Sequence, residues 1–439
     1  MLRFLLALTL LAPAPAQAQD GERPTNVVLF VADGSGPASY TLARRVLDRP
    51  LALDPHLVGS VSTAASDREV TDSAAGTTAF ACGVVTYRGA VGVDADGRPC
   101  RTVLEVAEAQ GMATGLVTTT ALTDATPAAF AAHVPQRGDH SAIAEQMLAQ
   151  GVEVLLGGGA RWFMPAPGGL REDDRNLMDE ARDAGYAVVT DPAALPDASA
   201  PLLGLFAPAV MAYEMDRDPE EEPSLVAMTE KALAVLREAP GGFFLLVETE
   251  GTDEAGHDND PAALARETEQ FDAAVAVALD FAEADGETLV VATSDHETGG
   301  LTLARPGADF WDPAVLRAVT QSHRMMRRRI EAGEAPEAVL RSAAGIADLT
   351  EAERARLESA ETRRDWQSAL SAVVSDRAGV AWSTFGHTAV DVGVYAFGPG
   401  SERLQGHRTS AELGVALLAM LGAAPAALDS PTPLPGWDE

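Results

Sequence analysis

Residues 243–257 read FFLLVETEGTDEAGH. Five apolar residues, Phe243–Val247, open the run and predict a buried strand. Glu248, Asp253 and His257 follow, spaced five and four residues apart. We expect these side chains to bind adjacent metal ions from one loop, because oxygen ligands suit Mg²⁺ and mixed Asp and His ligands suit Zn²⁺. The stretch therefore predicts a strand that ends in metal ligands.

Similar β-branched runs recur on both sides of this segment. Strands are predicted at residues 26–32, 113–118, 152–156, 243–248, 288–293 and 392–397, and helices at 101–110, 141–150, 224–237, 261–284 and 410–421. Strands that alternate with helices predict an α/β fold with a doubly wound, mostly parallel central sheet and helices on both faces. In such sheets, functional groups gather at the carboxyl ends of the strands.

Residues 306–379 break the alternation. This segment is polar and rich in arginine, and it predicts an inserted helical cap whose basic triplet at 327–329 forms a solvated helix face. The expected catalytic domain then comprises residues 19–305 and 380–425, and residues 426–439 form a proline-rich tail.

Residues 1–18 have the pattern of a signal peptide. Arg3 precedes a short apolar run, and Ala16-Gln17-Ala18 is a small-x-small cleavage pattern. The alternative is a membrane anchor, but the apolar run is too short to cross a bilayer. We therefore expect an exported protein, periplasmic or extracellular, with no membrane attachment after cleavage.

Acidic residues outnumber basic ones by 65 to 32, which gives a formal net charge of −33. Such a charge repels polyanions, so nucleic acid is excluded as a general partner. A small phosphate ester remains compatible, because metal ions and one arginine can reverse the field locally.

Cys82 and Cys100 are the two cysteines of the chain. In an exported protein a disulfide is favoured over two free thiols. The intervening residues are loop-like, and no further cysteine exists to share catalysis or metal binding.

Two glycine-rich segments carry further candidate groups. Asp33 lies in VADGSG (residues 31–36), where a carboxylate at a strand end can point at a metal. Ser73 lies in VTDSAAGTT (residues 70–78) at the predicted start of a helix, where free N–H groups favour an anion such as a phosphoryl group. The alternative is that Asp72 or Ser73 simply caps the helix.

The segment 124–137, DATPAAFAAHVPQR, offers a metal ligand and an anion clasp. Thr126 presents a hydroxyl for a hard cation, and Arg137 presents the planar fork that binds two phosphate oxygens. A competing interpretation makes Thr126 an N-cap before Pro127. His133 is expected to be structural.

Three of the eight histidines lie in similar settings. His257 ends the segment 243–257, His296 follows Asp295 directly after a predicted strand, and His387 lies in FGHT (residues 385–388). Several strand ends that each deliver Asp, Glu or His predict a multinuclear metal site, because buried charges need partners. The remaining histidines besides His133 are expected to be unremarkable: His56, His140, His323 and His407.

Together these residues resemble the alkaline phosphatase family, over residues 26–300 and again over 382–421. The resemblance implies a phosphate monoester hydrolase that holds two Zn²⁺ and one Mg²⁺. Its implied ligands are Asp33, Asp295 and His296 for one zinc; Asp253, His257 and His387 for the other; and Asp33, Thr126 and Glu248 for magnesium.

The resemblance also assigns the chemistry. Ser73 is implied as the nucleophile that becomes a phosphoserine, and Arg137 as the residue that binds the phosphoryl oxygens. Asp124 and Asp72 are expected behind these groups, with Asp124 orienting a water near the magnesium. Glu254 departs from the family, because it places a negative charge where other members carry basic or aromatic residues.

Two alternatives stay open. A phosphodiesterase or sulfatase-like hydrolase could use the same scaffold, although the Arg137 fork suits a dianionic terminal phosphoryl group. A non-catalytic, exported metal- or phosphate-binding protein would need the ligands but no nucleophile. The substrate is open, and so is whether the chain forms a homodimer.

Overall fold

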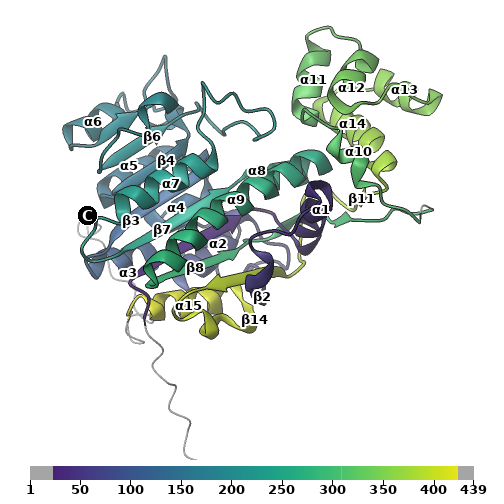
Figure 1. Ribbon diagram of the computed structural model, residues 1–439. Helices are drawn as coiled ribbons and strands as arrows, with labels where there is room; N and C mark the ends of the chain where they lie inside the picture. Colours follow the sequence, from purple (N-terminus) through teal and green to yellow (C-terminus); the bar gives the residue numbers. More distant parts are fainter. Residues whose placement is uncertain (1–22, 308, 424–439) are drawn as a thin grey trace, which may run out of the picture.

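The computed structural model describes residues 23–307 and 309–423 (Figure 1). The predicted signal peptide (residues 1–18) and proline-rich tail (residues 426–439) lie outside these ranges, and so do the predicted domain ends at residues 19 and 425. No helix in the described ranges is long and apolar enough to cross a membrane.

A ten-stranded sheet in the order β14-β2-β13-β8-β1-β7-β3-β4-β6-β5 forms the centre of the molecule. All neighbouring strands are parallel except β13, which is antiparallel to both β2 and β8. The strands are β1 (Asn26–Ala32), β2 (Leu57–Ser62), β3 (Ala113–Ala121), β4 (Val154–Gly158), β5 (Ala187–Val189), β6 (Leu202–Leu205), β7 (Phe243–Thr249), β8 (Thr288–Thr293), β13 (Val392–Phe397) and β14 (Gly406–Thr409).

Helices cover both faces of the sheet, as predicted (Figure 1). Alternate residues of β1 face opposite ways: Val27 and Leu29 pack in a core with α2, α3, α4, α5 and α15, whereas Val28 and Phe30 pack in a core with α1, α7 and α9. These helices are α1 (Pro37–Leu47), α2 (Ser73–Cys82), α3 (Val103–Ala109), α4 (Ala125–Ala131), α5 (His140–Gln150), α6 (Leu177–Asp183), α7 (Leu225–Leu236), α9 (Pro261–Asp285) and α15 (Ser410–Met420).

The sequence prediction was incomplete at the sheet edges. Strands β2, β5, β6 and β14 were not predicted, because they are short and lack a long apolar run. The strand predicted at 152–156 is shifted to Val154–Gly158.

The prediction of a single ligand-bearing loop after β7 was wrong. The chain forms α8 (Gly251–Asp258) there, which places Asp253 and His257 one turn apart on the same helix face. The helix was not predicted because it contains two glycines, Gly251 and Gly256, and glycine is a poor helix former. Packing explains both: a Cβ at Gly251 would lie 2.1 Å from an oxygen of Glu267, and one at Gly256 would lie 2.9 Å from the side chain of Thr298.

Five helices lie within residues 306–379 and form a lobe at one end of the sheet (Figure 1). The antiparallel pair β10 (Leu301–Thr302) and β11 (Ala381–Trp382) brings the two ends of this segment together. The apolar core of the lobe, which includes Leu340, Leu370 and Val374, is continuous with residues of α1 and α9 such as Leu42 and Leu264. Its helices are α10 (Pro313–Arg317), α11 (His323–Glu331), α12 (Pro336–Ala344), α13 (Glu351–Glu358) and α14 (Arg363–Ala378).

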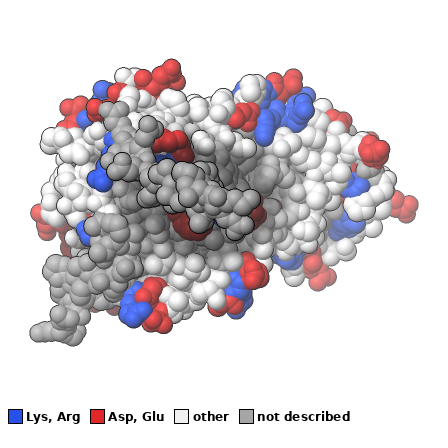
Figure 2. All heavy atoms as spheres, turned by 90° about the horizontal axis from the view of Figure 1, so that it is seen from below, with Lys and Arg blue, Asp and Glu red and all other residues white. Residues whose placement is uncertain are grey.

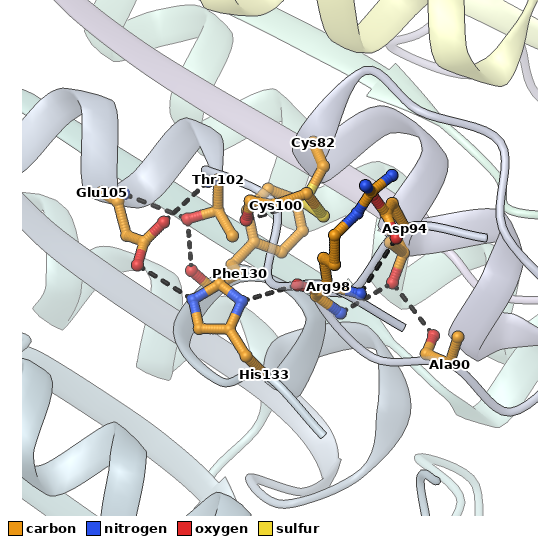
Figure 3. The surroundings of a disulfide bond; sticks show 11 residues. Cys82, Ala90, Asp94, Arg98, Cys100, Thr102, Glu105, Phe130 and His133 are labelled. Atoms are coloured by element: carbon orange, nitrogen blue, oxygen red, sulfur yellow. Dashed lines mark hydrogen bonds and ion pairs between the residues drawn. A yellow bond between two sulfur atoms is a disulfide. The ribbon is translucent and has the colours of Figure 1, made fainter. Parts of the chain in front are cut away.

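Cys82 and Cys100 form a disulfide that ties the end of α2 to the segment before α3 (Figure 3). His133 lies beside it, with Nδ1 2.6 Å from the carbonyl oxygen of Gly92 and Nε2 2.9 Å from Glu105. Both ring nitrogens are thus occupied by structural partners, which agrees with the expected structural role of His133.

Acidic and basic side chains are interspersed on the face shown in Figure 2, outside the atoms drawn grey. Many arginines are paired with carboxylates, as in Arg175 with Glu180 and Arg377 with Glu353. On this face the acidic side chains are therefore distributed among basic ones.

Candidate active site

Four adjacent strands, β8, β1, β7 and β3, deliver the candidate ligands to one edge of the sheet. Asp33 follows β1, and Glu248 lies at the end of β7. Asp295 and His296 follow β8, and Thr126 lies shortly after β3. Because parallel strands end at the same edge, these residues converge although up to 263 residues separate them in sequence (Asp33 to His296).

One group of ligands consists of Asp253, His257 and His387, whose donor atoms lie within 4.8 Å of one another. His257 Nε2 is 3.2 Å from Asp253 Oδ2, and the Nε2 atoms of the two histidines are 3.1 Å apart. Nδ1 of His257 faces the carbonyl oxygen of Phe385 at 2.6 Å. Such a backbone contact fixes the ring and leaves Nε2 for a cation.

A second group contains Asp33, Asp253 and His296. Asp295 Oδ2 is 3.2 Å and Asp33 Oδ1 is 3.5 Å from His296 Nε2. Asp253 thus lies between the two groups. The rings of His296 and His387 stack with centroids 3.7 Å apart, so the two groups are contiguous.

Ser73 lies against the second group. Its Oγ is 3.3 Å from His296 Nε2, and it occupies the first position of α2. Asp72 is the N-cap of this helix and accepts a hydrogen bond from Ala75 N at 3.1 Å. The capping interpretation is therefore correct for Asp72, while the Ser73 hydroxyl remains directed at the candidate ligands.

A third group contains Asp33, Glu248 and Glu250. Thr126 Oγ1 donates to Asp33 Oδ2 at 3.3 Å. The alternative that Thr126 is an N-cap is wrong, because Asp124 caps α4 and Thr126 lies inside the helix. The donor set of this group is oxygen only, which suits a hard cation.

Arg137 is held beside these groups by two acidic side chains. Its Nη2 donates to Asp124 Oδ1 at 2.7 Å, and its Nη1 lies 3.5 Å from Asp72 Oδ2. Arg137 thus links the segment after α4 to the helix start that carries Ser73. Asp124 and Asp72 both contact the arginine, and the expected role of Asp124 in orienting a water near a magnesium stays a prediction.

The buried carboxylates of these groups fit divalent cations. Burial, reinforced by neighbouring carboxylates, raises the pKa of Asp33 well above its ordinary value, that of Glu248 to about 8 and that of Asp295 to about 7. One oxygen of each of these three carboxylates is buried without a hydrogen-bond partner. Divalent cations would satisfy those oxygens and remove the mutual repulsion, so the residues present fit metal ions.

The histidines complete the fit. Burial and the nearby His387 lower the pKa of His296 well below its usual value, which favours the neutral ring that binds a metal. His257 behaves differently: burial lowers its pKa, but the hydrogen bond and charge of Asp253 outweigh burial and raise it to about 9. A metal at that site would therefore displace a proton from His257.

Sequence reasoning missed several residues. Glu250 belongs to the third group. Its position between Glu248 and Asp253, in one acidic segment, could have identified it from the sequence. Thr118, which donates to Glu248 at 2.6 Å, is an ordinary strand threonine in sequence and gave no signal. His323 was expected to be unremarkable, yet it is buried beside Asp260, 3.7 Å away.

The departure at Glu254 also has a structural counterpart. Its carboxylate forms an ion pair with Arg324 of α11, in the helical lobe. Arg324 also contacts Asp258, at the end of the ligand-bearing α8. The negative charge of Glu254 is therefore compensated by the lobe rather than left facing the site.

Comparisons with known proteins agree with this geometry. The family model for alkaline phosphatase matches residues 24–423. The chain is 40% identical to the repressible alkaline phosphatase of Saccharomyces cerevisiae, over 89% of this chain and 80% of that protein.

Two solved structures extend the comparison. The alkaline phosphatase of Thermus thermophilus superposes with a TM-score of 0.83 at 32% identity, covering 92% of each chain. A mutant of the TAB5 alkaline phosphatase, from an Antarctic bacterium, superposes with a TM-score of 0.69 at 27% identity, covering 92% of this chain and 99% of that one; it is described with Mg bound in its M3 site. The sequence match and the shared fold show that this chain belongs to the alkaline phosphatase family of metal-dependent phosphomonoesterases.

Proposed function

We propose that this phosphomonoesterase works through a phosphoserine at Ser73, with two Zn²⁺ and one Mg²⁺ bound by the three ligand groups. One zinc would be held by Asp253, His257 and His387. The other would be held by Asp33, Asp295 and His296. The magnesium would be held by Asp33, Thr126 and Glu248, and the Mg of the Antarctic relative supports a hard cation at this third position.

The bound cations would lower the pKa of hydroxyl groups and offset negative charge on the oxygens that enter and leave. The protein chain positions the reacting groups. In the first half-reaction Ser73 Oγ bonds to phosphorus and the ester P–O bond breaks, so the alcohol leaves with a proton. In the second, water attacks the phosphoserine, inorganic phosphate leaves and Ser73 recovers its hydroxyl.

Arg137 would bind two phosphoryl oxygens throughout this sequence. Asp124 and Asp72 orient its guanidinium group and restrict its side-chain conformations, so less conformational entropy is lost when substrate binds. A planar fork favours a terminal phosphoryl group with free oxygens, which supports a monoester over a diester.

The observation that carries this proposal is the 3.3 Å approach of Ser73 Oγ to His296 Nε2, within the second ligand group. The test is Ser73→Ala. We expect turnover of p-nitrophenyl phosphate to be lost while zinc content, measured by elemental analysis, stays at the wild-type level. Retained turnover would remove Ser73 from the mechanism.

The remaining alternatives have simple tests. A higher rate on bis-p-nitrophenyl phosphate than on p-nitrophenyl phosphate would favour a diesterase. We further propose export to the periplasm or the exterior, from the signal-like residues 1–18, and fractionation of cells that express the full chain would test it. Sedimentation of the purified protein would decide between a monomer and a homodimer.

A further inference from the structure

Glu250 is a buried acidic residue whose charge the proposed mechanism does not use. It lies at the N-cap of α8, two residues after Glu248, and is 8% exposed. One of its carboxylate oxygens lies within 4.8 Å of an oxygen of Asp33 and of an oxygen of Glu248. Three carboxylates therefore meet at one point.

Two ordinary roles for a carboxylate at this place are not fulfilled. Glu250 makes no side-chain capping hydrogen bond to the start of α8. Arg137, the nearby cation, forms its ion pairs with Asp124 and Asp72. The backbone of Glu250 is engaged: its N–H donates to Thr119 Oγ1 at 3.0 Å, and its carbonyl oxygen accepts from the N–H groups of Asp253 and Glu254.

The other two carboxylates of this group each have an unsatisfied oxygen. Glu248 Oε1 and Asp33 Oδ1 are buried and lack a hydrogen-bond partner, and both residues are at most 1% exposed. The other Glu248 oxygen accepts from Thr118, so the unpartnered oxygen is the one left for a ligand. Buried carboxylate oxygens that face one another without donors destabilise the fold unless a cation joins them.

We propose that Glu250 is an additional protein ligand of the third cation site, together with Asp33, Glu248 and Thr126. This inference rests on the magnesium site of the proposed function, but the family resemblance assigns only the other three residues to it. A site with three carboxylates and a hydroxyl takes a hard divalent cation of the Mg²⁺ class. An added anionic ligand predicts a tightly held ion.

The test uses the full-length enzyme, stripped with chelator and reloaded with Zn²⁺, and measures Mg²⁺ binding by calorimetry. We expect Glu250→Gln, which keeps the shape and removes the charge, to weaken Mg²⁺ binding about tenfold or more. The zinc content should not change. Glu254→Gln is the matched control, since it removes a charge from the same segment but outside the group, and it should bind Mg²⁺ within about twofold of wild type.

Thermal unfolding gives a second measurement that needs no turnover. Mg²⁺ should raise the Tm of the wild type more than that of Glu250→Gln, whereas the metal-free variant should be at least as stable as the metal-free wild type. A merely structural role would instead lower the Tm of the variant in both states. Wild-type-like Mg²⁺ affinity in Glu250→Gln, or an equal loss in Glu254→Gln, would overturn the assignment. A failure of Ser73 as nucleophile would leave these binding results unchanged.

Discussion

Removing Arg324 should expose how the helical lobe supports the metal-binding helix. Arg324 of α11 contacts Asp258 and Glu254 of α8, and its guanidinium lies 4.7 Å from the ring centroid of Tyr213. The Asp258 side chain is 1% exposed, and its remaining partners, Tyr213 and Gln367, are neutral. Arg324→Ala therefore leaves a buried carboxylate without its arginine partner.

The expected loss in the free energy of unfolding follows from the burial of this ion pair. Removing one partner of a buried ion pair costs about 3–5 kcal/mol, and the lower end applies because the Arg324 side chain is 23% exposed. Loss of the contact with Tyr213 adds about 1 kcal/mol. With an unfolding entropy of about 2 cal/mol/K per residue, a 439-residue chain that unfolds as one unit should lose about 4 °C in Tm.

The assay is thermal unfolding of the metal-loaded wild type, Arg324→Ala, Asp258→Asn and the double variant. Asp258→Asn removes the stranded charge, so the double variant should be more stable than the two separate losses predict, with a coupling free energy of about 2 kcal/mol. A Tm of Arg324→Ala within about 1 °C of wild type, or strictly additive losses, would refute this account of the contact between lobe and core.

Three further predictions concern the site and the core. Chelator should abolish phosphatase activity, and Zn²⁺ with Mg²⁺ should restore it; activity indifferent to chelator would contradict the ligand groups. Arg137→Ala should lower kcat/KM about 100-fold or more and weaken inhibition by phosphate, whereas unchanged inhibition would place the anion elsewhere. Burial raises the pKa of Glu108 from 4.5 to about 7, so its ionisation costs stability progressively as pH rises between these values. Glu108→Gln should therefore raise Tm relative to wild type more at pH 8 than at pH 4.5, and an equal difference at both would contradict this origin.

Much of the fold was predictable from the sequence because its central strands are continuous apolar runs. The strand at Asn26–Ala32 and the long helix from Pro261 agree with the structure almost residue for residue. The helix is well marked, since Asp260 caps it with Pro261 following and Gly286 ends it in the left-handed region. The edge strands have no such local signal, and their pairing depends on neighbours distant in sequence.

The candidate ligands were predictable for a different reason. Asp33, Asp295 and His296 follow apolar strands, where a buried charge demands a partner. Their type and order carry the family resemblance, which supplied the grouping. Neither source of information reported that Asp253 and His257 share a helix, because the glycines of that helix argue against it locally and are required only by its close packing on Glu267 and Thr298.

The sequence by itself determined the class of fold and the chemistry of the donor atoms, since these depend on residue type and short-range order. Ser73 as the candidate nucleophile came from the family resemblance that the sequence carries. Only the tertiary structure decided the distances between the donors and which further side chains lie beside them. Glu250 joins Asp33 and Glu248, and Arg324 reaches Glu254 from the lobe, through contacts between segments up to 217 residues apart (Asp33 to Glu250). Distances of a few ångströms between such segments are set by the packing of strands and helices, and no local pattern encodes them.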